Sequence, residues 1–516
     1  MADTQGAVGH TATVRLCGDD TAVRDRLMSV ATEAATDTPV VTVGSTGIPD
    51  IEPLVALSRG GVTDFLAHPD EATLSDVISA FEDGTLAADH ADFSVTHEET
   101  QWTFPAPDVG PLAVGIRRAL ARCGWVVPDA PTDYDAFAYE HAREAGDDAT
   151  ARLRRLSLLG RGRGDGRTDQ PITKAWDTAR ESAGDPVVVV NANESDPRNQ
   201  TDRTLLCGAP IDSIDAALAV AELVGEDAPA DVVCYLNEAD ELAQKRVRDA
   251  VAALEAEFSL SNPPEIVVGP DRFIAGEMTM ALEAMEGKDR LEARLRPPTP
   301  DVFGLYGRPT VIHTPRTLAQ VREAILSPDR FDAGSADPGT RLVTVTGGDS
   351  TATVELATDD SLSAVQEAVT FEGALKLACV GGQFGGLTRT LDVSANAPTL
   401  LDTNLGTDGA VELFGAHTCP VALAGTRSRF AAEENCGRCV PCREGSTQLV
   451  TLLRNVYDGE YDNGKIRELA RVMRETSTCD FGQLASRPVT TAMAAFEHEF
   501  IEHAAGRCPT GVCEEV

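Results

Sequence analysis

The sequence contains the stretch Glu434-Asn435-Cys436-Gly437-Arg438-Cys439-Val440-Pro441-Cys442-Arg443-Glu444-Gly445, in which three cysteines have C-x2-C-x2-C spacing, and Cys479 follows downstream. Three thiolates at this spacing can wrap one corner of an iron–sulfur cube while a fourth arrives from a neighbouring element. Gly437 permits a tight turn, and Pro441 stiffens the loop. We therefore predict a [4Fe-4S] cluster with the ligands Cys436, Cys439, Cys442 and Cys479.

The charges beside these cysteines agree with an anionic cluster. Arg438 and Arg443 flank the thiolates, and positive charge raises the reduction potential of a cluster and helps to keep thiols deprotonated. Zinc and unrelated structural cysteines are the alternatives. Zinc prefers paired C-x2-C units, so a run of three cysteines with short gaps fits it less well.

The composition excludes several classes of partner. The 516 residues include 82 acidic and 44 basic side chains, a formal net charge of −38. Binding to nucleic acid or to an anionic membrane needs clustered cations, so both are unexpected. Only five of the basic residues are lysines. An acidic, lysine-poor surface suits a salt-rich cytoplasm and predicts a halophilic protein; an ordinary acidic soluble protein is the alternative.

The chain shows no targeting or membrane-spanning signal. No stretch approaches the roughly 18–20 apolar residues of a membrane span, and residues 1–10 lack the basic start and apolar run of a signal peptide. We therefore expect a cytoplasmic protein without direct membrane insertion. In that compartment its twelve cysteines are reduced rather than paired in disulfides.

Hydrophobic patterning divides the chain into α/β regions and a helical end. Short apolar runs predict strands and periodic segments predict helices. The strands are expected at 11–16, 39–43, 54–57, 61–66, 186–190, 231–236, 265–268, 340–346, 351–356 and 375–380. The helices are expected at 22–35, 72–81, 112–123, 361–369, 447–456, 465–475 and 488–503.

The cysteine stretch resembles the cluster motif of the NADH-binding flavoprotein subunit of respiratory complex I. The same module occurs in β subunits of NAD-linked formate dehydrogenases and hydrogenases. Thr478-Cys479-Asp480-Phe481-Gly482 matches the family's downstream cysteine. Further segments that are similar to the family are Arg117–Tyr134, Val187–Arg203, Phe273–Lys288 and Gly304–Thr310.

The resemblance implies a multidomain α/β protein. The modules that it implies are a thioredoxin-like module without cluster cysteines (1–92), a linker with helices (93–147), a Rossmann-like FMN/NADH-type α/β domain (148–330), a β-grasp, ubiquitin-like domain (331–405), a helical [4Fe-4S] domain (406–505) and a cysteine-containing tail (506–516). The N-terminal module keeps only Cys17, so it cannot hold a [2Fe-2S] centre and is expected to serve in docking.

The resemblance also implies a function. NADH would reduce FMN, and electrons would pass to the [4Fe-4S] cluster and then to a partner subunit, expected to be a [2Fe-2S] thioredoxin-like protein. The activity would be that of an NADH:acceptor oxidoreductase if the flavin site is retained; the alternative is a flavin-free electron-transfer or scaffold subunit. No catalytic residue is assigned. The residues implied in cofactor binding are Gly162, Gly164, Lys174, Asn191, Asn193, Glu194, Gly276, Glu277 and Thr317.

The glycine-rich loop departs most from the family. Relatives that bind FMN have a loop of the type RGRGGAGFPTG, whereas this chain has the charged loop Gly160–Arg167, with Arg163, Asp165 and Arg167 among its glycines. Such side chains fill the space in which backbone N–H groups would hold a phosphate, and the aromatic residue beside the nicotinamide is missing. Other departures are Asn193 for Asp, Phe273 for Tyr, Met278 for the second Glu, and His313-Thr314 for an Asn pair.

The C-terminal tail contains a second possible metal site. Cys508-Pro-Thr-Gly-Val-Cys513 resembles a motif that leads into ferredoxin-like modules in hydrogenase-type relatives. His503 lies five residues before Cys508, so a zinc site with His503, Cys508 and Cys513 is chemically possible, and Cys419 could be the fourth ligand. Two solvent-side thiols without a metal are the alternative.

Overall fold

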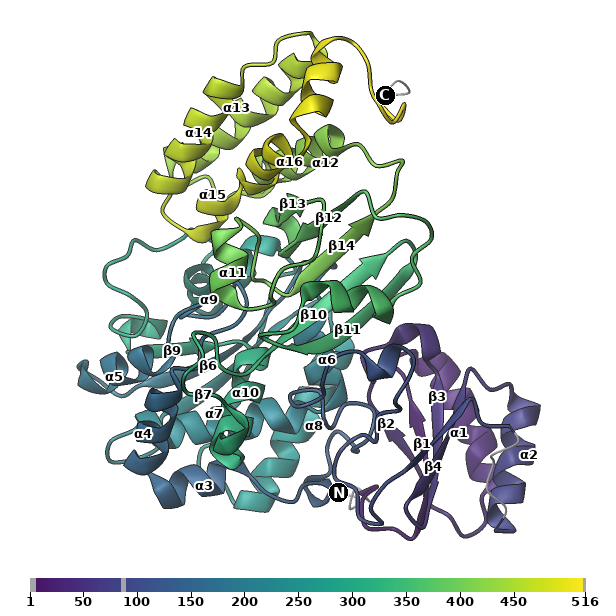
Figure 1. Cartoon of the computed structure of the whole chain (residues 1–516). Helices are drawn as coiled ribbons and strands as arrows, with labels where there is room; N and C mark the ends of the chain where they lie inside the picture. The colour runs from purple at the N-terminus through teal and green to yellow at the C-terminus, as the bar shows by residue number, and fades with distance from the viewer. Residues whose placement is uncertain (1–5, 85–89, 514–516) are drawn as a thin grey trace.

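The computed structural model describes residues 6–84 and 90–513. It contains three β-sheets and a C-terminal helical bundle, a mixed α/β arrangement of several parts (Figure 1). The N-terminal sheet lies at one end of the molecule, the bundle lies at the other, and the two remaining sheets lie between them (Figure 1).

The N-terminal sheet has five strands in the order β2-β1-β3-β4-β5. Its only parallel pair is β1 with β2, and the other neighbours are antiparallel. The apolar faces of two helices pack on it through Leu27, Leu74 and Phe81. The bounds are β1 Ala12–Cys17, α1 Thr21–Ala34, β2 Val40–Val43, β3 Leu54–Arg59, β4 Val62–Ala67, α2 Glu71–Glu82 and β5 Phe93–Thr96.

The second sheet is entirely parallel, with the order β8-β7-β6-β9. All six residues of β6 are buried, as expected for an inner strand covered on both faces. The strands are β6 Val187–Ala192, β7 Asp231–Asn237, β8 Glu265–Gly269 and β9 Thr310–His313. The helices around them are α3 Ala138–Ala145, α4 Asp147–Leu156, α5 Thr173–Glu181, α6 Thr201–Gly208, α7 Pro210–Val224, α8 Glu241–Phe258, α9 Met278–Met285 and α10 Pro315–Leu326.

The third sheet has the order β11-β10-β14-β12-β13. Its first hairpin turns at Gly348 and Asp349, and β10 pairs in parallel with β14. The bounds are β10 Thr340–Gly347, β11 Ser350–Ala357, β12 Leu377–Val380, β13 Gly386–Thr388, α11 Ala397–Asp402 and β14 Ala410–Phe414.

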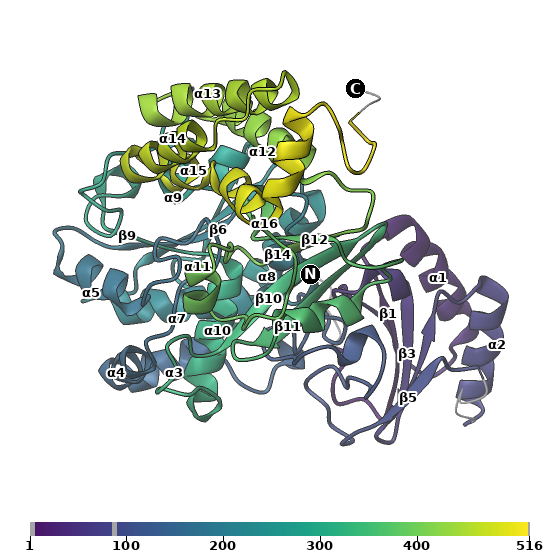
Figure 2. The same ribbon diagram turned by 45° about the horizontal axis from the view of Figure 1, so that its top comes forward.

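Five helices form the C-terminal bundle (Figure 2), and α16 packs on β13. Its core includes Leu449, Ile466, Val489 and Phe496. The helices are α12 Pro420–Glu434, α13 Val440–Tyr457, α14 Asn463–Thr476, α15 Asp480–Leu484 and α16 Arg487–Ala504.

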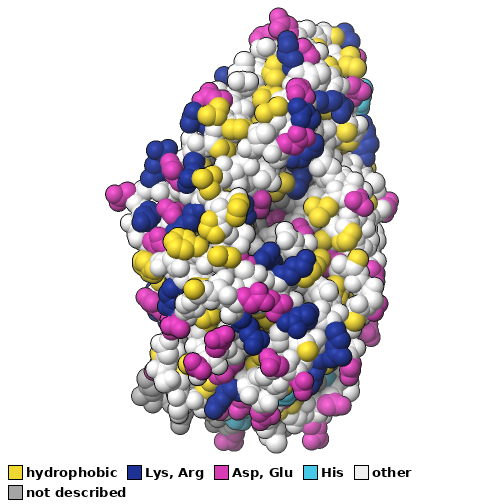
Figure 3. Space-filling view, turned by 90° about the vertical axis from the view of Figure 1, so that its left-hand side faces the viewer, with side chains coloured by type: hydrophobic (Ala, Val, Ile, Leu, Met, Phe, Trp, Pro, Cys, Tyr) yellow, Lys and Arg dark blue, Asp and Glu magenta, His cyan; other side chains and the backbone are white. Residues whose placement is uncertain are grey.

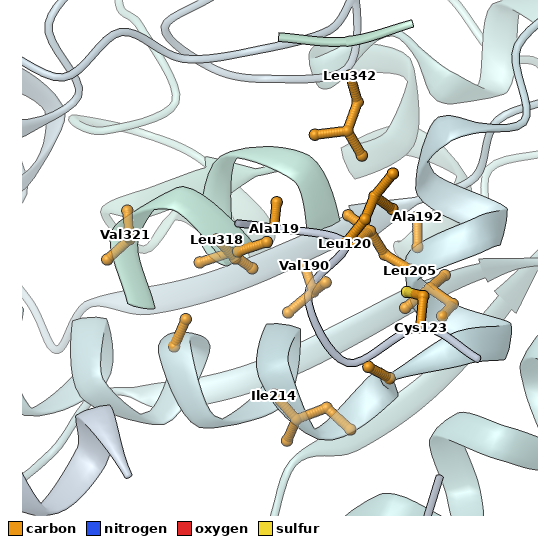
Figure 4. Packing of buried hydrophobic residues seen from close by; sticks show 14 of the residues in the cluster. Ala119, Leu120, Cys123, Val190, Ala192, Leu205, Ile214, Leu318, Val321 and Leu342 are labelled. Carbon is orange, nitrogen blue, oxygen red and sulfur yellow. The ribbon is translucent and has the colours of Figure 1, made fainter. Parts of the chain in front are cut away.

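The largest core joins the three sheets. In its centre Val190 of β6, Ile214 of α7 and Leu318 of α10 pack together (Figure 4). Leu120 and Cys123, from the segment between β5 and α3, join them. Burial of such side chains stabilises the fold by about 25 cal/mol per Å² of apolar surface. One continuous core therefore fixes the parallel sheet relative to its neighbours.

Two helices expected from the sequence are absent. Over 112–123 the chain forms a short 3-10 turn, Pro111–Ala113, followed by turns. The buried carboxylate of Glu355 accepts backbone N–H groups from Arg118, Ala119 and Leu120, so these groups do not continue a helix. The segment 361–369 forms the 3-10 helix Leu362–Ala368 instead of an α-helix.

Acidic and basic side chains are interspersed on the face shown in Figure 3, and hydrophobic side chains lie among them. In the part of the chain that the structure describes, no single helix has the length and apolarity to cross a bilayer. The pair α6 and α7, bent by 97°, meets those two criteria only when taken together.

Candidate functional site

The four predicted cluster cysteines line one cavity. Cys436, Cys439 and Cys442 come from the α12–α13 junction, and Cys479 comes from the start of α15. Met280, Ala293 and Phe481 close the cavity with apolar surface, and Arg438 also lines it. Among the described residues, the ligand atoms that all lie within 4.8 Å of one another belong to a different group: Cys419, His503, Cys508 and Cys513. The four cysteines thus surround a space instead of meeting at a single ion.

The positive end of α13 faces the cavity. Cys439 is its N-cap, Pro441 occupies the first turn, and Cys442 follows in the same turn. The N-terminus of a helix carries partial positive charge and stabilises nearby anions. Arg443 donates to the carbonyl of Gly437 over 2.8 Å and fixes the loop between the first two ligands. This arrangement suits an anionic iron–sulfur cluster.

Two glycines in this region are required by geometry. Gly437 has φ +77°, a conformation that most side chains disfavour. A Cβ on Gly482 would lie 2.8 Å from Cβ of Cys442, so only glycine lets α15 approach α13 this closely. The pattern Cys479-Asp480-Phe481-Gly482 therefore places the fourth ligand beside the other three.

The metal-free thiols differ in their acidity. Burial and the neighbouring thiols of Cys439 and Cys436 raise the pKa of Cys442 to about 12. Burial, followed by the carboxylate of Glu277, raises the pKa of Cys479 well above its usual value. Burial also acts on Cys439, but hydrogen bonds from Thr478 and other backbone groups leave its pKa lowered. Iron binding must therefore displace protons from the two buried thiols.

Most of the predicted cofactor-binding residues meet at the carboxyl edge of the parallel sheet. Asn191 Nδ2 donates to the carbonyls of Gly164 and Gly276, at 2.9 and 3.0 Å. Thr317 Oγ1 accepts the backbone N–H of Arg161, and Glu277 caps α9. Gly162, Asn193 and Glu194 belong to the same group through their contacts with Arg316, Asn237 and Arg163. Lys174 is the exception, because it is exposed on α5.

An arginine of the glycine-rich loop fills part of the space between these residues. The Arg163 guanidinium lies 3.9 Å from the ring centroid of Phe273 and forms an ion pair with Glu194 over 2.6 Å. Its backbone N–H donates to Asp408 over 2.9 Å. Burial opposes its charge, but the carboxylates led by Glu194 leave the pKa of Arg163 raised. The arginine is thus held by two carboxylates and one aromatic ring.

A carboxylate of the same loop occupies the start of α10. Asp165 Oδ2 accepts the backbone N–H of Thr314 over 3.3 Å and lies 3.0 Å from His313 Nδ1. Trp176 donates its indole N–H to His313 Nε2, so His313 is protonated at Nδ1 and donates to Asp165. Asp165, His313 and Trp176 are all buried. Asp165 therefore stands where the start of a helix could bind a phosphate.

These contacts test whether the loop fits a flavin. A Cβ on Gly164 would meet Asn191 Nδ2 at 2.7 Å and the Gly276 carbonyl oxygen at 2.8 Å, and a Cβ on Gly162 would meet the Arg316 guanidinium at 2.9 Å. The two glycines therefore contact protein instead of bordering an open cradle. The loop residues therefore do not fit a bound FMN, whereas the four thiols that line one cavity supply the donor set of an iron–sulfur cluster.

Comparison with known proteins places the two sites in known domains. Residues 422–503 match the NADH-ubiquinone oxidoreductase-F iron-sulfur binding region, and residues 155–323 match the Nuo51 FMN-binding domain. The F subunit of the NADH-quinone oxidoreductase of Streptomyces coelicolor is 31% identical over 472 residues, which cover 85% of this chain and 93% of that protein. This chain belongs to the F-subunit family of NADH-quinone oxidoreductases. It thus carries the iron–sulfur region and the FMN-binding domain of an NADH-binding electron-transfer subunit.

Hydrogenase subunits are also similar to this F-family chain. NADP-reducing hydrogenase subunit HndC of Solidesulfovibrio fructosivorans is 27% identical, over 77% of this chain and 86% of that protein. The crystal structure of NAD+-reducing [NiFe]-hydrogenase in the air-oxidized state has a similar fold, with a TM-score of 0.66 at 22% identity. The alignment covers 96% of this chain and 85% of that one.

The structure brings together aromatic residues that sequence reasoning did not connect in this F-family chain. Phe273, Phe384, Phe430 and Phe481 form one aromatic cluster, with ring centroids 4.9 to 6.0 Å apart. No spacing in the sequence predicts it, because the four residues come from four separate elements. The cluster joins the two sites: Phe273 touches Arg163, and Phe481 lines the cysteine cavity.

Proposed function

We propose that this chain is an electron-transfer subunit of an NADH dehydrogenase-type complex, in which Cys436, Cys439, Cys442 and Cys479 ligate a [4Fe-4S] cluster. The observation that carries the proposal is the single cavity lined by these four cysteines at the start of α13. When bound, the cluster supplies one-electron transfer.

The surrounding residues tune and shield this site. Arg438 and the N-terminus of α13 stabilise the reduced, more negative cluster and thereby raise its potential. Met280 and Phe481 exclude water from the inner side. This apolar lining strengthens the electrostatic effects of Arg438 and of the helix N-terminus on the cluster, because the local dielectric constant is low.

The outer side of the cavity is suited to electron exit. Cys436 and Cys439 are partly exposed, whereas Cys442 and Cys479 are buried, and Val440 between the ligands is 58% exposed. A redox centre of a partner could approach closely on this side. The relatives are named as subunits of an NADH-quinone oxidoreductase and of an NADP-reducing hydrogenase, which supports other redox subunits as partners. We propose a [2Fe-2S] thioredoxin-like protein as the neighbour.

Electrons could reach the cluster by two routes. The first begins with NADH and FMN in the matched FMN-binding domain, and the aromatic cluster connects that domain with the cysteine cavity. On this route Arg163 must leave Glu194 and Asp165 must leave the start of α10. The second route is a flavin-free subunit that receives electrons from another protein. The closed loop with Arg163 and Asp165 is the observation behind this second candidate.

The domain boundaries and finer module types are part of the same proposal. They are a thioredoxin-like module (1–92), a linker (93–147), a Rossmann-like FMN/NADH-type domain (148–330), a β-grasp domain (331–405), a helical cluster domain (406–505) and a tail (506–516). The N-terminal sheet, the parallel sheet and the helical bundle support this division in outline. Two bounds are wrong: β5 (Phe93–Thr96) pairs with β4, so the first module extends beyond residue 92, and β14 (Ala410–Phe414) pairs with β10 and β12, so the third sheet extends beyond residue 405. We also propose that the protein works in a salt-rich cytoplasm, on the basis of its charge of −38.

Anaerobic purification in molar salt tests the function. Flavin released by denaturation would be measured first, and electron paramagnetic resonance spectra would be recorded after addition of NADH and, separately, of dithionite. A cluster signal with NADH together with released FMN supports entry through FMN. A signal with dithionite alone, in protein without flavin, would refute that route and support the flavin-free subunit. Absence of iron from the anaerobic protein would refute both.

A further inference from the structure

Three cysteines and a histidine meet at the C-terminal end of the bundle. The ligand atoms of Cys419, His503, Cys508 and Cys513 all lie within 4.8 Å of one another. Cys419 Sγ lies 3.4 Å from His503 Nε2. Cys419 and His503 are buried, and the two tail cysteines are partly exposed. The group lies apart from the cysteines assigned to the iron–sulfur cluster, and electron transfer as proposed above does not use it.

The two buried members are held by rigid elements. Cys419 is the N-cap of α12, where its sulfur accepts the backbone N–H of Ala422 over 3.4 Å. His503 lies in the last turn of α16, and its Nδ1 donates to the carbonyl of Glu499 over 2.6 Å. That bond fixes the tautomer, so the lone pair of Nε2 points toward the sulfurs. Histidine ligands of metal ions are oriented by such a bond on the other ring nitrogen.

The tail places its two thiols by a tight turn. Gly511 donates its backbone N–H to the carbonyl of Cys508 over 3.1 Å, and its φ of +74° suits glycine. Cys513 Sγ then lies 3.7 Å from the Tyr457 hydroxyl of α13. The Tyr457 ring meets the His503 ring edge to face, with centroids 5.4 Å apart. Both tail cysteines therefore face a site already formed by the helices.

We propose that Cys419, His503, Cys508 and Cys513 bind one Zn²⁺ ion, which fastens the C-terminal tail to the helical bundle. Three thiolates and one imidazole are a ligand set of structural zinc sites, which are tetrahedral. Four protein ligands leave no open position for a substrate, so the ion has a structural and not a catalytic role. Softer thiolate ligands also disfavour Mg²⁺ and Ca²⁺.

The ion would join three parts that are distant in sequence. Cys419 precedes α12, His503 ends α16, and the two remaining ligands lie beyond the last helix. At its start the tail is held by Arg507, which pairs with Glu502 of α16 over 2.7 Å. Beyond Arg507, Cys508 and Cys513 pack partly buried on the core of the bundle. Removal of the metal should therefore free the tail while the helices stay folded.

Metal analysis of the full chain tests the proposal. Purified protein is expected to contain about one zinc ion per chain, in addition to the iron of the cluster. The double variant Cys508→Ser/Cys513→Ser should lose the zinc and keep the iron. The matched control Cys439→Ser should lose the iron and keep the zinc. Because each variant loses one metal and keeps the other, a failure of the zinc proposal can be distinguished from a failure of the proposed electron-transfer function.

Limited trypsin digestion provides a second measurement. Arg507 is exposed and directly precedes the first tail cysteine. A mercurial reagent that displaces the zinc from the thiolates should accelerate cleavage after Arg507. The same reagent should release an equal amount of zinc to a colorimetric chelator. Protein that contains no zinc, a tail disulfide in reduced preparations, or iron in place of zinc at this site would each overturn the proposal. Unchanged zinc in the double variant would overturn the ligand assignment.

Discussion

At the scale of single residues, the sequence predicts the cluster ligands but not the contacts of the glycine-rich loop Gly160–Arg167. The spacing of Cys436, Cys439 and Cys442 is local, so the sequence alone predicts that the three thiols meet. The bond between Asp165 and His313 joins residues 148 positions apart, and no local pattern indicates it. Sequence comparison showed that the loop departs from its family, but only the structure shows what the new side chains do.

Asp165 gives a residue-scale prediction. Its carboxylate occupies the start of α10 by accepting the Thr314 N–H, so Asp165→Gly should free that helix end for an external phosphate. Added FMN should then raise the unfolding temperature of the variant more than that of the unchanged protein, because a ligand that binds only the folded state stabilises it. Differential scanning fluorimetry with and without FMN measures the shift.

The control for this prediction is Asp349→Gly. Asp349 is an exposed residue in the turn of the β10–β11 hairpin, so its replacement should leave the response to FMN unchanged. An equal response to FMN in all three proteins would show that Asp165 does not close the loop.

At the scale of helices and strands, patterning predicted every strand of the parallel sheet except β9. It failed at 112–123, where an apolar, helix-like segment is instead held by one distant side chain. Glu355 accepts three successive N–H groups there. A long-range polar contact of this kind outweighs the local preference for helix, and hydrophobic periodicity carries no information about it.

Arg322 provides the element-scale prediction. This buried arginine of α10 lies 2.9 Å from Asp215 and 3.4 Å from Asp212, both on α7. Asp215 also accepts the N–H groups of Ala138 and Tyr139 at the start of α3. Arg322→Met should destabilise this helical layer by about 3–5 kcal/mol, because it removes the cation that pairs with the buried carboxylate of Asp215, whereas Asp212 keeps Arg122 at 3.7 Å. Hydrogen exchange of α3 and α7 measures the loss.

The comparison variant is Arg471→Met. Arg471 pairs with Glu468 and Glu475 on the exposed face of α14, where solvent screens the pairs and they contribute little to stability. A similar loss of stability in both variants would contradict the role assigned to the buried network.

At the scale of the whole molecule, net charge gives a prediction about salt. With 82 acidic and 44 basic residues, the negative charges of the folded chain repel one another. This repulsion reaches over roughly 10 Å at 0.1 M salt but only over roughly 3 Å at 1 M salt, where the ions screen it more strongly. Transfer from molar to 0.1 M potassium chloride should therefore lower the unfolding temperature. Sucrose added at low salt is the control, since it stabilises folded proteins without screening charge.

An unfolding temperature that does not depend on salt would contradict the halophilic interpretation. It would leave the site assignments untouched, because those depend on buried contacts. Composition indicates how the surface interacts with its solvent, but the arrangement of the three sheets and the bundle follows from a core whose members lie far apart in sequence. For this reason the sequence predicted the number of parts better than their packing.

The most direct test of the central claim is the content and spectrum of the cluster in the protein and in one ligand variant. Anaerobically purified protein should contain about four iron and four sulfide ions per chain, and dithionite should produce the paramagnetic signal of a reduced [4Fe-4S] cluster. Cys439→Ser should abolish that signal while the α/β domains stay folded. An unchanged spectrum in the variant, or protein without iron, would contradict the account.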